Sequence, residues 1–331
     1  MEHITLLGQQ IPRMGLGCWA IGGPFYSGNK AYGYGKVDDK QSIDAIEYAY
    51  DQGIRLFDTA PAYGIGHSES ILGQALKNKP DAIISSKIGL ECNRVTKQFI
   101  GPETDPETIV KSIDESLSRL QRERIGLLFL HLNSLSIEEA EPIFDRLDTL
   151  VQEGKLGAYG WSTDFSQSIA AMAEREHFRC VQHCMNVFFS PNKIQQLTQK
   201  HELVSFCRSP LAMGLLTGKF QAGSSITAGD IRGQSEEWLD YFKDGKVNDH
   251  YIEQLDRIRR ALTRSGRTPA QGALAWILRH DSRAVPIPGF RNRQQVAENI
   301  AALSLGSLED NAYAEIEQLM NRPVDYQERE R

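Results

Sequence analysis

The sequence predicts an α/β fold built on a parallel sheet, and two observations lead to this prediction. Short apolar runs alternate with longer segments of helical periodicity along the chain, and this alternation is typical of parallel sheets. The chain has 331 residues, of which 40% are hydrophobic and 24% charged, so it can bury a large core. We expect a single domain over residues 1–331.

Eight strands are expected, each followed by a helix. The strands are the short apolar runs at 14–19, 54–57, 82–86, 125–130, 156–162, 180–185, 203–208 and 284–287. The helices are the periodic segments at 38–53, 68–78, 106–121, 137–153, 165–176, 192–201, 269–280 and 293–304. Pro106 is suited to a first helical turn, and Gly53 is suited to a helix end. Residues 4–12 alternate around Gly8 and predict a small N-terminal β-hairpin.

Two long insertions interrupt this alternation of strands and helices. Residues 20–37 are rich in Gly and Tyr and follow the first strand, whereas residues 213–250 follow the seventh and contain Trp238, Tyr241 and Phe242. Loops of this length usually have a function. We expect both to form walls or lids over a substrate site. The alternative is that their aromatic side chains only pack the two loops together.

Charge and cysteine usage exclude several classes of partner. The net charge of −6 argues against nucleic acid or an anionic membrane as the main partner. No apolar run approaches the roughly 20 residues of a spanning helix, and the N-terminus lacks a basic and then apolar signal. The five Cys residues are an odd number, which points to reduced thiols and a cytoplasmic protein. The oligomeric state stays open.

Titratable side chains stand at the ends of three successive strands. Asp58 follows the second strand and precedes Tyr63 by five residues, Lys87 ends the third strand, and His131 follows the fourth. A phenol has a pKa of about 10, so it donates a proton at neutral pH only if a cation stabilises the phenolate. Lys87 can supply that cation, and Asp58 can supply the carboxylate that a buried ammonium needs.

This set of residues resembles the catalytic tetrad of the aldo-keto reductases. The resemblance rests on Asp58-Thr59-Ala60 with Tyr63-Gly64, and on Lys87 and His131 after strands. It implies a (β/α)8 TIM barrel plugged by the N-terminal hairpin, with a nicotinamide cofactor and no Rossmann domain. It also implies that Tyr63 is the general acid, that Lys87 lowers its pKa, that Asp58 holds Lys87, and that His131 orients or polarises a carbonyl.

The first predicted strand also contains a pattern that resembles the Rossmann fingerprint of dinucleotide-binding folds. Residues 15–20 read Gly-Leu-Gly-Cys-Trp-Ala, and Asp38 follows about 20 residues later. That fingerprint has to open a helix. The run of Gly, Pro and Tyr over residues 21–35 cannot continue one, so the fingerprint is set aside.

The ends of three later strands resemble the family's nicotinamide site. Amide and hydroxyl side chains at a barrel mouth can hold a carboxamide, and the resemblance assigns this role to Ser162 and Gln182. Thr163 stands where relatives commonly have Asn. Arg208 stands where many have a stacking Tyr. Its charge would favour NADPH over NADP⁺ or admit an anionic substrate, unless Arg208 turns away toward a carboxylate.

Strand eight and the helix after it predict a phosphate site. A strand that ends at Gly289, Arg291 nearby and a helix N-terminus together suit an anion, and an Arg at the ribose favours NADP(H) over NAD. The resemblance implies contacts to the adenosine half and the pyrophosphate from residues of two segments. These residues are Ser209, Leu211, Gly214 and Lys219, and Gly289, Arg291, Gln295, Glu298 and Asn299.

The sequence disfavours two metal-based functions. Cys180 and Cys184 share one strand face whereas His183 points the other way, so a structural zinc site with four converging ligands is disfavoured. A metal-dependent barrel hydrolase would use His131 but lacks a His-x-His pair on an early strand. No metal is expected. The sequence favours NADPH-dependent reduction of an aldehyde or ketone, and the alternative is a nicotinamide-binding sensor or regulatory subunit with little turnover.

Overall fold

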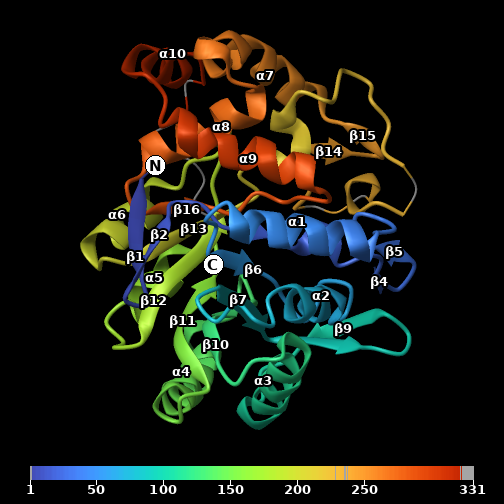
Figure 1. Cartoon of the computed structure of the whole chain (residues 1–331), viewed down its shortest axis with the longest axis vertical. Helices are drawn as coiled ribbons and strands as arrows, with labels where there is room; N and C mark the ends of the chain where they lie inside the picture. The colour runs from blue at the N-terminus through green and yellow to red at the C-terminus, as the bar shows by residue number, and fades with distance from the viewer. Residues whose placement is uncertain (1, 228, 235, 237, 321, 323–331) are drawn as a thin grey trace.

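Eight parallel strands form the central sheet of the computed structural model, which describes residues 2–227, 229–234, 236, 238–320 and 322 (Figure 1). The strands are neighbours in the order β16-β13-β12-β11-β10-β7-β6-β3. Their bounds are β3 Leu16–Gly17, β6 Leu56–Asp58, β7 Ile83–Ile88, β10 Ile125–Leu130, β11 Leu156–Ser162, β12 Phe178–Cys184, β13 Val204–Arg208 and β16 Ala284–Pro286. The predicted strands are therefore confirmed to within a few residues.

The two end strands of this sheet meet and nearly close it into a barrel. Gly17 forms a parallel bridge with Gly289, and its N–H donates to the carbonyl of Pro288 at 3.0 Å. A Cβ at position 17 would lie 2.8 Å from the carbonyl oxygen of Ile287, so glycine lets the strands approach. The barrel prediction is confirmed, and residues 15–20 belong to a barrel strand and a short 3₁₀ turn, Trp19–Ile21.

Helices surround the barrel (Figure 1). Most match the predicted segments: α1 Asp39–Asp51, α2 His67–Ala75, α3 Pro106–Leu120, α4 Ile137–Gln152, α5 Ser166–Met172, α6 Asn192–Lys200, α8 Pro269–His280 and α9 Arg293–Leu305. Two further helices, α7 Asp249–Leu262 and α10 Asp310–Met320, were not predicted. Both pack against the chain through an apolar stripe, which includes Ile252, Leu255 and Ile258 on α7. They were missed because the prediction assigned a single helix to each of the eight strands, and these two helices are additional to that pattern.

The N-terminal hairpin closes one end of the barrel, as predicted. Strands β1 His3–Leu6 and β2 Gln9–Pro12 pair antiparallel around Gly8. Ile4, Leu6 and Ile11 join the apolar side chains that fill the barrel interior, including those of Leu127 and Phe129. This end of the barrel is therefore sealed by hydrophobic packing.

The opposite end carries the insertions (Figure 1). The first insertion contains β4 Tyr26–Ser27 and β5 Lys30–Ala31, which continue into β9 Gln98–Pro102 and β8 Leu90–Asn93 as a four-stranded sheet. The second contains β14 Phe242–Lys243 and β15 Lys246–Val247. The β8–β9 hairpin was not predicted. Within the part of the chain that the structure describes, no helix is both long and apolar enough to cross a bilayer.

The loop after β6 has little steric freedom, and this generates the first prediction. Gly64 adopts a φ of +65°, and a Cβ there would lie 1.6 Å from the carbonyl oxygen of Gly22. Gly64→Ala should therefore lower the free energy of unfolding by roughly 2 to 4 kcal/mol, measured by urea denaturation. Gly101→Ala is the matched control, because a Cβ there meets nothing within 4 Å. Equal effects of the two substitutions would contradict this steric account.

Candidate active site

A buried ion pair lies at the open end of the barrel. Lys87, on β7, donates from Nζ to Asp58 Oδ2 at 2.7 Å and to the carbonyl of Thr59 at 2.7 Å. The Lys87 and Asp58 side chains are only 0% and 3% exposed. The other carboxylate oxygen of Asp58 accepts from Ser85 Oγ and from Gln182 Nε2, both at 2.9 Å. Both charges are therefore paired and hydrogen-bonded, which a buried ion pair requires.

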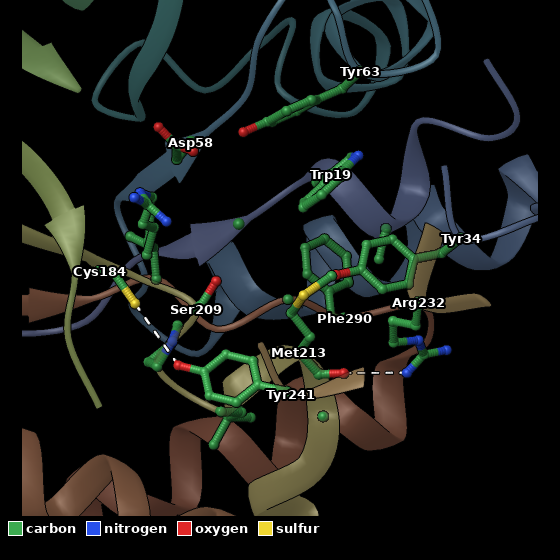
Figure 2. Close-up of a pocket in the computed structure, with 18 of the residues that line it drawn as sticks. Trp19, Tyr34, Asp58, Tyr63, Cys184, Ser209, Met213, Arg232, Tyr241 and Phe290 are labelled. Atoms are coloured by element: carbon green, nitrogen blue, oxygen red, sulfur yellow. Dashed lines mark hydrogen bonds between the residues drawn. The ribbon is translucent and has the colours of Figure 1, made fainter. Parts of the chain in front are cut away.

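The loop after β6 holds Tyr63 beside this pair. Thr59 Oγ1 donates to Ser68 Oγ at 2.8 Å, and Ser68 Oγ donates to the carbonyl of Cys18 at 3.0 Å, so the loop is tied to the first strand. Lys87 Nζ lies 4.9 Å from the centre of the Tyr63 ring. Figure 2 shows the Tyr63 hydroxyl directed toward the side where Asp58 lies.

His131 and Trp19 complete the surroundings of Tyr63. The His131 ring stands edge-on to the Tyr63 ring with centroids 6.4 Å apart. The Trp19 ring stacks on the Tyr63 ring with a centroid distance of 5.9 Å and an interplanar angle of 18°, and Figure 2 shows the two rings facing one another. The structure thus brings the four predicted side chains of Asp58, Tyr63, Lys87 and His131 together at one rim.

Two opposing effects act on the pKa of Tyr63. Burial raises it, the positive charge of Lys87 and a hydrogen bond to it lower it, and the net direction is upward from 10.0. Lys87 therefore lowers the pKa of Tyr63, as predicted, but burial raises the same pKa by more. For Lys87 itself, burial lowers the pKa, yet Asp58 and Tyr63 raise it more, so the ammonium stays charged.

His131 is a neutral imidazole at physiological pH. Burial, followed by the positive charges of Lys87 and Arg208, lowers its pKa to about 3. A neutral imidazole still donates one hydrogen bond, so His131 can polarise a carbonyl as a donor without acting as a cation.

An elongated cavity of about 840 Å³ opens from Tyr63 and His131. Trp19, at the end of the first predicted strand, lines it together with Tyr34 and Trp238 from the two insertions. Of the residues predicted to hold a cofactor, those along its wall are Ser162, Gln182, Arg208, Ser209, Leu211, Gly214, Lys219, Gly289, Arg291, Gln295, Glu298 and Asn299. Thr163 is not among them, since its hydroxyl donates to the carbonyl of Asn133 at 2.6 Å and accepts from the Phe165 N–H at 3.2 Å.

Arg208 forms an ion pair on the cavity wall. Its Nη2 contacts Oδ2 of Asp164, so Arg208 has the carboxylate partner of the predicted alternative, but it remains on the cavity wall and does not turn away. Asp164 also lines the cavity and was missed at the sequence level. The signal that was overlooked is a carboxylate one residue after Thr163, just past β11, which only β12 separates from the strand that ends in Arg208.

Cations gather at the far end of the cavity. Burial lowers the pKa of Lys219, and the positive charges of Arg232 and Arg291 lower it further. Among the described residues no carboxylate lies within ion-pair distance of Lys219, whereas Arg232 pairs with Asp230 at 2.6 Å. An ammonium without a carboxylate partner among the described residues, beside two guanidinium groups, suits an anion.

Backbone strain marks the turn that leads into this end. Ser209, Ala212 and Met213 all have positive φ values, of 51°, 47° and 54°. Non-glycine residues in the left-handed region are held there at an energetic cost, and such residues cluster at functional sites. The turn follows β13 and lines the cavity through Ser209 and Met213.

Comparison with known proteins agrees with this geometry. The model of the Aldo/keto reductase family matches residues 13–321. The chain belongs to the aldo-keto reductase family. It is 28% identical over 307 residues to aldo-keto reductase YhdN of Bacillus subtilis (strain 168), which covers 89% of this chain and 87% of that protein. It is 31% identical over 324 residues to the NADH-specific methylglyoxal reductase of Escherichia coli (strain K12), with 89% and 90% covered.

A solved structure of this family has the same fold. The glycerol dehydrogenase AKR11B4 from Gluconobacter oxydans superposes with a TM-score of 0.80 at 27% identity, over 98% of this chain and 97% of that one. The match thus covers nearly the whole of both chains. The resemblance inferred from Asp58, Tyr63, Lys87 and His131 is confirmed at the level of the family.

The side chains considered above as zinc ligands have other contacts in this aldo-keto reductase. The described residues contain no group of three or more His, Cys, Asp or Glu side chains that could hold a metal ion. His183 Nε2 lies 2.7 Å from Ser205 Oγ, and Cys180 is buried in the barrel interior. Both side chains are fully buried in the interior of the protein.

The low pKa of His131 generates the second prediction. An ordinary histidine titrates near pH 6.5, whereas His131 should remain neutral between about pH 5 and pH 8. Two-dimensional NMR of the imidazole carbon-bound protons should show a His131 resonance whose chemical shift stays constant over this range. A His131→Gln spectrum assigns the resonance, and exposed His250 is the internal control. A His131 shift that moves with a midpoint near 6.5 would contradict the assignment.

Proposed function

We propose that this aldo-keto reductase reduces an aldehyde or ketone to an alcohol with NADPH. The observation that supports this most is the buried Lys87–Asp58 pair placed against Tyr63, with a neutral His131 beside it, at one end of a long cavity. A proton donor, a cation that stabilises its conjugate base and a hydrogen-bond donor are the groups that carbonyl reduction requires.

The residues of the cavity fit a dinucleotide phosphate. Bound there, the cofactor supplies the hydride that is transferred to the carbonyl carbon. Ser162 and Gln182 would hold its carboxamide near Tyr63. Along the pyrophosphate we assign the turn residues Ser209, Leu211, Gly214 and Lys219, and at the adenosine end Gly289, Arg291, Gln295, Glu298 and Asn299.

Details of the structure refine two of these assignments. Gln182 already donates from Nε2 to Asp58 Oδ1, so its carbonyl oxygen would be the atom left to accept from a carboxamide amine. Arg291 Nη1 donates to the carbonyl of Tyr34 at 3.1 Å, and its Nη2 contacts the carbonyl of Lys36. The Arg291 charge therefore stays at the adenosine end, which supports a preference for the 2′-phosphate of NADPH. Since one relative is named as NADH-specific, both cofactors belong in the test.

The reaction follows from the protonation states of this chain's own side chains. Tyr63 is protonated at neutral pH, since burial raises its pKa, so it can protonate the alkoxide that develops on the substrate oxygen. Lys87 stabilises the phenolate left behind, and Asp58 keeps Lys87 in place. His131 donates a hydrogen bond to the same oxygen, which helps to orient the carbonyl.

Removal of the Tyr63 hydroxyl gives the third prediction. Tyr63→Phe should lower kcat for a panel of aldehydes and ketones about a thousandfold. The Kd for NADPH should change little, because the hydroxyl is assigned to the substrate oxygen and not to the cofactor. Absorbance of NADPH, with NADH in parallel, follows turnover in both directions. Tyr50→Phe is the control, since that hydroxyl bonds to Asp81 on the surface. Turnover retained by Tyr63→Phe would reject the assignment, and no turnover in the unmodified protein would favour the sensor alternative.

The pH dependence of the reaction gives the fourth prediction. Because the acid form of Tyr63 is required and its pKa lies above 10.0, kcat for reduction at saturating NADPH should stay level from about pH 6 to about pH 9 and fall only above about pH 10. Oxidation of an alcohol needs the phenolate, so its kcat should rise over the alkaline range instead. A fall in the reduction rate with a midpoint near pH 6.5 would instead indicate a histidine acid or base.

A further inference from the structure

Of the two departures from the family pattern, Arg208 belongs to an ion pair, and Thr163 directly precedes the partner in that pair. Thr163 turns away from the cavity, and the next residue, Asp164, takes a place on the wall. Asp164 Oδ2 contacts Arg208 Nη2. We propose that Asp164 and Arg208 act as one neutral unit that sets the relative affinity for the oxidised and reduced nicotinamide cofactor, an inference that rests on the proposed function.

Asp164 is held firmly in this position. Its N–H donates to Asn133 Oδ1 at 2.7 Å, and its Oδ1 accepts from the Cys184 N–H at 2.9 Å. The side chain is only 9% exposed. A carboxylate with so little contact with water needs a cation, and Arg208 is the residue that provides it.

Arg208 is more open to the cavity than its partner. Its side chain is 35% exposed, and it lines the same cavity as Tyr63 and His131. Its positive charge acts on both of these residues, lowering the pKa of each. The guanidinium is therefore close enough to influence charge at the reacting end of the cavity.

Charge on a nicotinamide ring changes during turnover, and this gives the pair its significance. The ring is neutral when reduced and cationic when oxidised, so a lone guanidinium beside it would weaken binding of the oxidised form. A lone carboxylate would strengthen binding of that form. Because Asp164 and Arg208 neutralise one another, a planar guanidinium can lie on the wall without opposing the oxidised ring. Arg208 thus takes a position where many relatives have an uncharged aromatic residue, without adding net charge.

A double-mutant cycle tests this inference through binding alone. The Kd values of NADP⁺ and NADPH are measured by titration calorimetry for the unmodified protein, Asp164→Asn, Arg208→Gln and the double variant. Asp164→Asn leaves the guanidinium unpaired and should raise the ratio of Kd for NADP⁺ to Kd for NADPH about tenfold. Arg208→Gln leaves the carboxylate unpaired and should lower the ratio about tenfold. The double variant should return to within about threefold of the original ratio.

A purely structural pair would behave differently. If Asp164 and Arg208 only tie the loop after β11 to the end of β13, both Kd values should change together and the ratio should stay constant, which would overturn the inference. Asp81→Asn is the matched control, because it breaks the remote Arg55–Asp81 pair of 2.7 Å and should leave the ratio unchanged. If Asp164→Asn folds poorly, Arg208→Gln alone still tests the inference, with an effect of opposite sign.

Failure of this inference can be distinguished from failure of the proposed function. An unmodified protein that binds neither NADPH nor NADP⁺ would reject both. An unmodified protein that binds NADPH and loses turnover in Tyr63→Phe, but whose two single variants keep the original ratio, would reject only the role of the pair.

Discussion

The ion pair between Lys87 and Asp58 is the constraint on which the site depends. Two charges removed from water are stable only if every remaining polar atom finds a partner, and here the partners come from three strands and a loop. Lys87 lies on β7, Asp58 ends β6, and Gln182 reaches Asp58 from β12. The same hydrogen bonds that neutralise the pair therefore fix the strand ends relative to one another, and with them the position of Tyr63.

This arrangement also explains why two neighbouring titratable groups have pKa values so far apart. The site combines low exposure to water with a positive field from Lys87 and Arg208. Burial raises the pKa of Tyr63 and lowers that of His131, because it disfavours the charged form of each. The positive field opposes the first shift and adds to the second. One environment thus keeps a phenol protonated and an imidazole neutral, the two states that Tyr63 and His131 need if they are to donate to the same oxygen.

Much of this organisation could be predicted because it is local in sequence. Each tetrad residue follows or ends a strand, and parallel strands bring such ends to one rim. What could not be predicted depends on partners distant in the chain. The pairing of Arg208 with Asp164 joins two strand ends 44 positions apart, and the bonds of Arg291 to the carbonyls of Tyr34 and Lys36 span more than 250. Periodicity says which side chains face a rim, but not which neighbours they meet there.

The two insertions show how packing and function can share the same residues. The first is tied to the second by Glu236, which accepts from Lys30 at 2.7 Å and from Tyr32 at 2.9 Å, and by the N–H of Ile231, which donates to the carbonyl of Gly33 at 2.8 Å. Trp19, which directly precedes the first insertion, also packs against the second, since the Trp19 and Trp238 ring centroids lie 6.4 Å apart. Yet both rings line the cavity, so the wall and the packing alternatives do not exclude each other. Because Arg291 also holds the carbonyl groups of the first insertion, the wall beside Tyr63 is fastened to the end of the cavity where phosphate is proposed to bind.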